Sequence, residues 1–260
     1  MNIKLNSSVR ALILIMIALV ITSIVIAKTY YGNINKLIDP RIVNARKLYA
    51  KYDNYAQEGD YYRIFALLDS IENIYRATKH YESSFELGVL HNNKAAAFLT
   101  ISMFTDSIPK EYNPYPELRK DSLVFLAETN ILKAISIYNS LETTFSGKSE
   151  EQICKTIEQS FLNGLENINQ DIKIKYLETR AKDIEKAVLE NDRRLSVCHT
   201  NLGIVFRQKG EYKQAAIQYK KALELWDRNL NAENNLNRLL GKPIVKRNFI
   251  QKLFPPERDQ

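Results

Sequence analysis

The feature of this sequence that most restricts its fold is a helix–break–helix pattern that recurs along the chain. Residues 201–226 read NLGIVFRQKGEYKQAAIQYKKALELW, with one break at Gly210. The second half of this stretch, residues 211–224, aligns with residues 130–142. In both segments a small residue, a tyrosine and a further apolar residue are spaced so that all three share one helical face. The matched residues are Ala215, Tyr219 and Ala222 in one segment and Ala134, Tyr138 and Leu141 in the other.

Such repetition predicts an all-α fold in which antiparallel helix pairs stack, because a single pair cannot bury its apolar face alone. The 260-residue chain has only eight glycines and seven prolines, which would supply few of the tight turns that an all-β fold needs. Pro109, Pro114 and Pro116 exclude a continuous helix from a Pro-rich insertion at residues 106–121. The expected helices cover residues 45–75 with a break at Gly59, residues 85–101, residues 122–142, two segments within 150–190, and residues 231–241.

Residues 196–229 resemble a tetratricopeptide repeat, a unit of about 34 residues built from two antiparallel helices. The family's leucine–glycine pair matches Leu202 and Gly203. Two positions differ, since His199 stands in place of the family's tryptophan and Asp227 in place of its closing proline. The resemblance implies that the characteristic positions pack helices together. These positions are Leu202, Gly203, Phe206, Gly210, Tyr212, Ala215, Tyr219 and Ala222.

A weaker resemblance extends over residues 45–240. Residues 45–75 are similar to one copy of the repeat, and residues 91–142 are similar to a copy whose turn is expanded by the insertion. Residues 150–195 have the length of a unit but little of its motif. Residues 231–241 resemble a first helix that would cap the stack.

The N-terminal part of the sequence contains an apolar run at residues 11–27. Seventeen residues at about 1.5 Å each give roughly 25 Å, the short end of what spans a bilayer. We expect residues 1–28 to be an uncleaved membrane anchor, because the run is longer than a usual signal-peptide core. A cleaved signal peptide is the alternative. Residues 29–44 would then be a juxtamembrane linker.

The charges around the apolar run give conflicting evidence on orientation. Lys4 and Arg10 favour a cytoplasmic amino terminus, whereas the basic residues after the run oppose it. We expect a single-pass membrane protein whose body is extracytoplasmic. The opposing residues are Lys28, Lys36, Arg41, Arg46 and Lys47.

The C-terminal tail, residues 241–260, is both basic and apolar. It could lie on a membrane surface or pack back on the last helix as a cap, and packing is the preferred interpretation. The net charge of +7 is spread along the whole chain, with no basic stripe interleaved with aromatic residues. We therefore expect no nucleic-acid partner.

The sequence contains little that points to catalysis. It lacks the motifs of nucleophile elbows, P-loops, zinc proteases and dinucleotide-binding sites. Cys154 and Cys198 have no metal-ligand spacing with the histidines, and a disulfide between them would require a compartment outside the cytoplasm. We expect no enzymatic activity, no metal and no cofactor.

A few polar residues remain as candidates for binding. Asn201 precedes the leucine–glycine pair, and Asn93 and Asn235 are interpreted as holding the similar place in other units. In tetratricopeptide proteins an asparagine at this place often faces a concave groove, where its amide can bond an extended peptide backbone. Helix capping or simple exposure is the alternative. The neighbours expected on that surface are Thr200, Ile204, Arg207 and Gln208.

These observations predict a membrane-anchored scaffold or assembly factor that holds a partner polypeptide in a concave groove. The alternative is a sensor or regulatory module that binds a small ligand or lipid near the insertion at residues 106–121. A helical hydrolase with degenerate motifs is a third hypothesis, and it would need a deep polar pocket or a metal.

Overall fold

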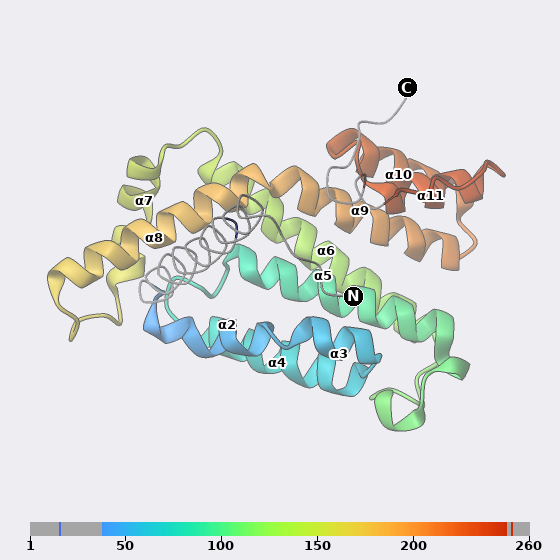
Figure 1. Cartoon of the computed structure of the whole chain (residues 1–260), viewed down its shortest axis with the longest axis horizontal. Coiled ribbons are helices and arrows are strands. Elements are labelled where there is room, and N and C mark those ends of the chain that lie inside the picture. Colours follow the sequence, from blue (N-terminus) through green and yellow to red (C-terminus); the bar gives the residue numbers. More distant parts are fainter. Residues whose placement is uncertain (1–15, 17–37, 249–250, 252–260) are drawn as a thin grey trace, which may run out of the picture. The chain divides into compact units, whose positions relative to one another are not determined.

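The computed structural model describes Met16, residues 38–248 and Gln251 (Figure 1). The chain divides into two units, residues 1–40 and residues 41–260. Every regular element among the described residues is a helix, which confirms the all-α prediction. Apart from Met16, the expected anchor at residues 11–27 lies outside the described residues. No helix within the described ranges combines the length and apolar character that crossing a bilayer requires.

The first helix pair of the second unit follows a short 3₁₀ turn, η1 (Pro40–Ile42). Its first helix is divided into α2 (Val43–Tyr49) and α3 (Tyr52–Glu58), which both pack against the second helix, α4 (Tyr61–Ala77). The expected break is present, because Gly59 ends α3 with a φ of 69°. Asp60 then caps α4 by accepting a hydrogen bond from the Arg63 backbone N–H at 2.9 Å. The buried face of α4 includes Ile64, Leu67, Leu68 and Ile71.

The second pair consists of α5 (Phe85–Phe104) and α6 (Lys120–Phe145). The Pro-rich insertion joins them and contains only two short 3₁₀ turns, η2 (Thr105–Ser107) and η3 (Lys110–Tyr112). The ring of Tyr115, which belongs to the insertion, packs against two phenylalanine rings. Its centroid lies 5.0 Å from that of Phe65 and 5.3 Å from that of Phe98. The insertion is therefore anchored on α4 and α5.

The third pair, α9 (Asn191–Gln208) and α10 (Tyr212–Leu225), turns at Gly210, whose φ is 78°. A Cβ added to Gly203 on α9 would lie 2.6 Å from Tyr219 Cδ1 on α10. The same contact exists in the second pair, where a Cβ on Gly88 would lie 2.7 Å from Tyr138 Cε1. In both pairs the absence of a side chain lets a buried tyrosine ring rest on the opposite helix.

This shared contact corrects the alignment of the repeat. Gly88 is the structural counterpart of Gly203, so the residue that corresponds to Asn201 is Glu86. The expected equivalence of Asn93 with Asn201 is therefore wrong. The leucine–glycine pair of the second unit was missed because the alanine run that follows it offered a more obvious match.

Most of the expected packing residues are buried between helices. Ala215, Tyr219 and Ala222 have no exposed surface, and Phe206 packs against the cluster that they form with α11. Tyr212 differs, because 60% of its surface is exposed. It is the first residue of α10 and is mostly exposed, so its predicted role in helix packing is wrong. Leu202, at 7% exposure, is buried as expected.

A fourth pair, α7 (Glu150–Leu162) and α8 (Gln170–Leu189), lies between the second and third pairs in the chain. Ser149 and Gln152 form a capping box at the start of α7. α8 continues into α9 through the single residue Glu190, and Figure 1 shows the two helices following each other along one long path. A single residue between them replaces the turn that normally separates repeats.

The last helix, α11 (Leu230–Leu239), closes the stack against α10 and α9, as expected for a cap. Asn229 precedes it and is buried, with its amide nitrogen donating to Ser196 Oγ at 2.8 Å and to Thr200 Oγ1 at 3.0 Å. Beyond α11, the described tail residues 242–248 run along this helix. Asn234 holds Val245 through two hydrogen bonds, so this part of the tail packs back on the last helix.

Candidate functional site

Two first helices, α5 and α9, run parallel, which creates a shared surface. Contacts between α5 and α9 follow the same order along both helices, from a cation–π contact to a side-chain hydrogen bond and then to an N–H···S contact. The contacting pairs are Phe85 with Arg194, Asn92 with Asn201, and Met103 with Arg207. A parallel arrangement of first helices is what a stack of hairpins requires for a continuous face.

A cavity of about 420 Å³ lies on this surface, and we call it the groove. Three first helices contribute to it, so it depends on the stacking and not on any one hairpin. A second cavity of about 300 Å³ adjoins it, because both are lined by Glu190 and Arg194. The groove is lined by Tyr49 of α2, Val89 and Asn92 of α5, Arg193, Arg194 and Val197 of α9, and by Tyr138 and Glu190.

Arg194 is the most unusual residue of the groove. Its Nη2 donates to Glu190 at 3.1 Å, and its guanidinium lies 5.0 Å from the Phe85 ring centre. Its Nη1 is buried and makes no hydrogen bond within the described part of the chain. Because an unpaired buried donor on a charged group is costly, this nitrogen is suited to an acceptor from outside the chain.

The groove's other polar groups are held by neighbours. The Tyr49 hydroxyl accepts a hydrogen bond from Asn93 Nδ2 at 3.0 Å. Burial raises the pKa of Tyr49, and the bond from Asn93 opposes that rise in part, so the hydroxyl keeps its proton and can donate it. Asn92 Oδ1 accepts from Asn201 at 3.0 Å. Asn93 and Asn201 thus orient groove residues without lining the cavity themselves.

The remaining sequence candidates divide between the surface and the core. Arg207 and Asn235 meet at 3.5 Å near the far end of α9. Thr200 is buried and bonded to Asn229, and Ile204 packs against the α10–α11 core, so neither lines the groove. The reason is that α9 faces α10 and α11 on the side that carries these two residues. Gln208, the last residue of α9, is half-buried.

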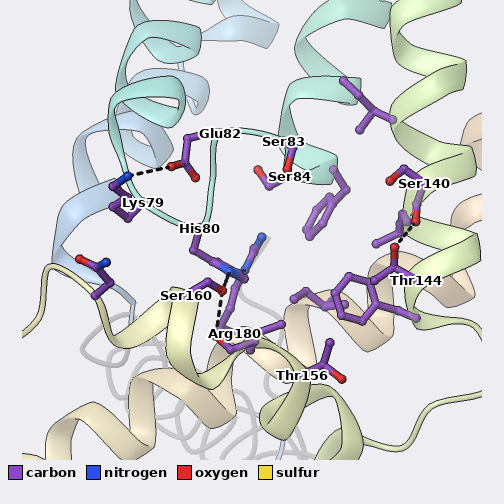
Figure 2. Close-up of a pocket in the computed structure, with 17 residues that line it drawn as sticks. Lys79, His80, Glu82, Ser83, Ser84, Ser140, Thr144, Thr156, Ser160 and Arg180 are labelled. Carbon is purple, nitrogen blue, oxygen red and sulfur yellow. Dashed lines mark hydrogen bonds and ion pairs between the residues drawn. The ribbon is translucent and has the colours of Figure 1, made fainter.

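A separate cavity of about 450 Å³ lies below the α4–α5 connection (Figure 2). Residues from this connection and from α6, α7 and α8 line it, and none belongs to the Pro-rich insertion. We call it the hydroxyl cavity because six of its lining residues carry hydroxyl groups. They are Ser83, Ser84, Ser140, Thr144, Thr156 and Ser160.

One wall of the hydroxyl cavity is a chain of polar contacts that starts at the buried Arg180 and ends at the exposed Ser160. Arg180 of α8 binds both carboxylate oxygens of Glu86, at 2.5 and 3.2 Å, and donates from Nε to His80 Nε2 at 3.1 Å. His80 Nδ1 in turn lies 3.1 Å from Ser160 Oγ. Because Nε2 accepts a hydrogen bond, Nδ1 carries the proton and donates it to Ser160. The chain ties α5 and the α4–α5 connection to α7 and α8.

The Arg180–Glu86 pair is ionised. Burial would raise the pKa of Glu86, but the adjacent Arg180 charge and its hydrogen bonds outweigh burial and lower that pKa. Burial likewise opposes the charge of Arg180, yet Glu86 holds the Arg180 pKa above its ordinary value. The guanidinium also stacks 4.4 Å from the Tyr81 ring centre. These contacts satisfy two charges that would otherwise be too costly to bury.

The other titratable candidates have internal partners. Burial lowers the pKa of His199, whose Nδ1 lies 2.8 Å from Gln218 Oε1. Both cysteines are free thiols, and burial raises the pKa of Cys198 to about 12. Within the ranges that the structure describes, no three His, Cys, Asp or Glu residues are grouped to hold a metal ion.

Sequence reasoning missed Arg194, Arg180 and Glu86. Arg180 and Arg194 lie on helices rich in charged residues, so each resembles an ordinary solvated side chain, and Glu86 stands at the start of its helix, where an exposed carboxylate is common. The signal that could have found Glu86 was the leucine–glycine pair directly after it. No protein-family model, no curated protein and no solved structure significantly matches this chain.

Proposed function

We propose that this chain is a non-enzymatic, membrane-anchored scaffold or assembly factor of tetratricopeptide type. Its groove would hold an extended segment of a partner polypeptide. The observation that carries the proposal is the buried, unpaired Nη1 of Arg194 in a groove shared by α2, α5 and α9. An acidic side chain or a backbone carbonyl of the partner would accept its hydrogen bond.

The groove offers the chemistry that an extended peptide needs. Val89 and Val197 supply apolar contact area, and Tyr49 supplies an amphipathic ring with a free hydroxyl proton. Arg193 and Arg194 give it an excess of positive charge over Glu190. An acidic segment would therefore be favoured over a basic one.

The chain's own tail illustrates how its asparagines bind an extended backbone. Asn234 Oδ1 accepts from the Val245 backbone N–H at 2.7 Å, and Asn234 Nδ2 donates to the Val245 carbonyl at 2.9 Å. Asn237 adds a bond to the Pro243 carbonyl at 3.2 Å. Asn201 carries the same amide group but already donates to Asn92, so it would act on a partner through Asn92, whereas Asn235, which accepts from Arg207, remains a candidate for contacting a partner's backbone.

Site-specific photocrosslinking of the full chain in its native membrane would test this proposal. A photoreactive residue is placed at Val197 in the groove or, as a control, at the exposed Ile217 on α10. We expect a polypeptide crosslink from Val197 that Arg194→Gln reduces about tenfold, because a hydrogen bond to a charged group contributes about 1.5–3 kcal/mol. Arg63→Gln, at an exposed arginine of α4, should leave the crosslink unchanged.

Asn201→Ala should weaken the same crosslink less than Arg194→Gln does, because Asn201 acts on the groove through Asn92. Equal crosslinking from Val197 and Ile217 would contradict the proposal. So would a Val197 crosslink that is insensitive to Arg194→Gln.

A further inference from the structure

A further cavity, of about 470 Å³, lies where the last turns of α9 and α11 meet the first residue of α10. We call it the arginine cleft, and its lining residues are Arg207, Tyr212, Arg238 and Leu239. It shares none of them with the groove or with the hydroxyl cavity. The described lining therefore carries two positive charges and no negative one.

The two guanidinium groups of the arginine cleft lie close to each other. Arg207 Nη1 lies 3.5 Å from Asn235 Oδ1, and Arg238 is on the same face of α11 as Asn235, one helical turn later. Tyr219 gives an independent indication. Burial raises the pKa of its hydroxyl to about 12, and the charges of Arg207 and Arg238 oppose that rise. One hydroxyl responds to both charges because both lie near it.

Neither arginine has a strong acceptor within the described chain. Arg207 has only the 3.5 Å contact to Asn235 and a 3.9 Å contact from Nη2 to Met103 Sδ, and both acceptors are uncharged. The side chain of Arg238 is exposed and forms no hydrogen bond or ion pair with the residues that the structure describes. A guanidinium has five N–H donors, so most of these donors are available to a ligand.

The helix ends around the cleft leave its positive charge uncompensated. Arg207 and Arg238 each lie in the last turn of a helix, whose C-terminus carries roughly half a negative charge, but each guanidinium carries a full positive one. α10 begins at Tyr212 and has no acidic residue in its first turn, so its N-terminus adds roughly half a positive charge. The N-cap residue Glu211 neither caps α10 with its side chain nor lines the cleft.

This combination of groups suits a phosphate better than a carboxylate. A single guanidinium can satisfy both oxygens of a carboxylate, so two adjacent guanidinium groups suit an anion with more acceptors and more charge. A phosphate monoester has three terminal oxygens and a charge of about −1.5 to −2 at pH 7. The exposed ring of Tyr212 and the side chain of Leu239 offer apolar surface to the group that carries the phosphate.

We propose that the arginine cleft binds a phosphate monoester, which is either a soluble organic phosphate or a lipid headgroup. Its oxygens would accept hydrogen bonds from Arg207 and Arg238, and its organic part would lie against Tyr212 and Leu239. The volume of about 470 Å³ falls within the range of roughly 300–1,000 Å³ typical of small-molecule sites. Because the ligand would join α9 to α11, its binding stabilises the C-terminal end of the stack. The site is independent of the groove.

Isothermal titration calorimetry and thermal unfolding of the purified full-length chain in detergent micelles test this inference. The first two probes are phenyl phosphate and phenyl sulfate, which have the same shape and three terminal oxygens, but the sulfate carries only one negative charge. We expect phenyl phosphate to bind and to raise the melting temperature. Phenyl sulfate should bind at least tenfold more weakly, because one charge is missing opposite two guanidinium groups.

Two short-chain lipids distinguish the sources of the phosphate. Dioctanoyl phosphatidate carries a phosphate monoester, whereas dioctanoyl phosphatidylglycerol carries a diester with a single charge. We expect the monoester lipid to bind more tightly than the diester lipid. Tighter binding of phosphatidate than of phenyl phosphate would identify a lipid headgroup as the ligand, and the reverse order would identify a soluble phosphate.

Substitutions of Arg238 separate a ligand role from a role at the helix end. Arg238→Gln should weaken phenyl phosphate binding about tenfold, the loss expected for one hydrogen bond between charged groups. Arg238→Lys keeps the charge in the last turn of α11 but loses the planar donor fork, so it should weaken binding several-fold and leave the melting temperature of the free chain unchanged. Arg63→Gln, at an exposed arginine of α4, and Arg194→Gln, in the groove, should leave phenyl phosphate binding intact.

Three results would overturn the proposal. The first is that neither phenyl phosphate nor phosphatidate binds at concentrations on the order of 10 mM, beyond the weakest affinities relevant to such a site. The second is equal binding of phosphate and sulfate, or of the two lipids. The third is that Arg238→Gln binds phenyl phosphate as tightly as the unaltered chain does.

Discussion

Gly203→Ala should destabilise the third helix pair. The added methyl group would lie 2.6 Å from Cδ1 and 3.0 Å from Cζ of Tyr219, where ordinary contacts are 3.4–4 Å. The Tyr219 side chain has no exposed surface and is enclosed by α11 as well as α9, so it cannot swing into solvent. The substitution must therefore shift a ring or separate two helices.

The expected loss follows from two opposing effects. Alanine is favoured over glycine within a helix by about 1 kcal/mol. Overpacking a buried site costs about 1–3 kcal/mol and can cost more. Because three atoms of an enclosed ring lie within about 3 Å of the new methyl group, the upper end applies. The net loss is about 2 kcal/mol, which corresponds to a fall in melting temperature of roughly 4–8 °C for a domain of this size.

Thermal unfolding followed by circular dichroism measures this loss, and Tyr219→Leu provides the decisive background. Removing the ring opens space for the methyl group, so Gly203→Ala in the Tyr219→Leu chain should be neutral or stabilising by up to about 1 kcal/mol. Gly88→Ala should behave like Gly203→Ala because of Tyr138. A loss that persists in the Tyr219→Leu background would refute the steric explanation.

Three further predictions concern other parts of the fold. Asn229→Ala should cost about 2–4 kcal/mol in urea unfolding, since it removes a helix cap and leaves buried hydroxyl groups without their donor, whereas Asn231→Ala at an exposed position should cost little. Burial would raise the pKa of Glu72, but hydrogen bonds from Lys94 and Arg76 lower it to about 2. The folding stability that Glu72 contributes is therefore complete above its ordinary pKa of 4.5 and is lost as the pH falls towards 2. A Glu72→Gln chain should show a shallower loss between pH 5 and about 3 in the same assay. Tyr115→Ala should make the Pro-rich insertion at least several-fold more sensitive to limited proteolysis, and unchanged protection would contradict its anchoring on α4 and α5.

Local sequence patterns predicted the helix pairs because each depends on residues close in the chain. Gly59 and Gly210 marked two turns that the structure places at positive φ. Ala215 and Tyr219 were spaced for one buried face, and both are fully buried. Such signals come from periodicity and backbone freedom, which do not depend on what the helix packs against.

Contacts between distant helices were harder to predict. Tyr212 had the residue type of a packing position, yet its place at the start of α10 leaves it exposed. Thr200 looked like a surface neighbour of Asn201, but one helical step turns it toward Asn229. Arg180 and Glu86 are 94 residues apart, and no local pattern links them. Their pairing depends on where the connection between α8 and α9 places α8 relative to α5. No sequence motif predicts the course of that connection.

At the N-terminus of α5, the position before the leucine–glycine pair has a different role from the equivalent position in the third unit. In the third unit the position before the leucine–glycine pair holds Asn201, which orients the groove through Asn92. In the second unit the same position holds Glu86, which binds Arg180 and so fixes the α7–α8 pair. A carboxylate suits this second task, because only an ionised partner can compensate the buried guanidinium.

Phe85 forms a wall between the hydroxyl cavity and the cavity that adjoins the groove. Arg194 lies 5.0 Å and Arg180 5.1 Å from its ring centre, and the ring lines both the hydroxyl cavity and the cavity that adjoins the groove. A substitution at Phe85 would therefore change both sites together. Ser84 and Arg194 are the positions that separate them, since Ser84 lines only the hydroxyl cavity and Arg194 only the groove and its neighbour.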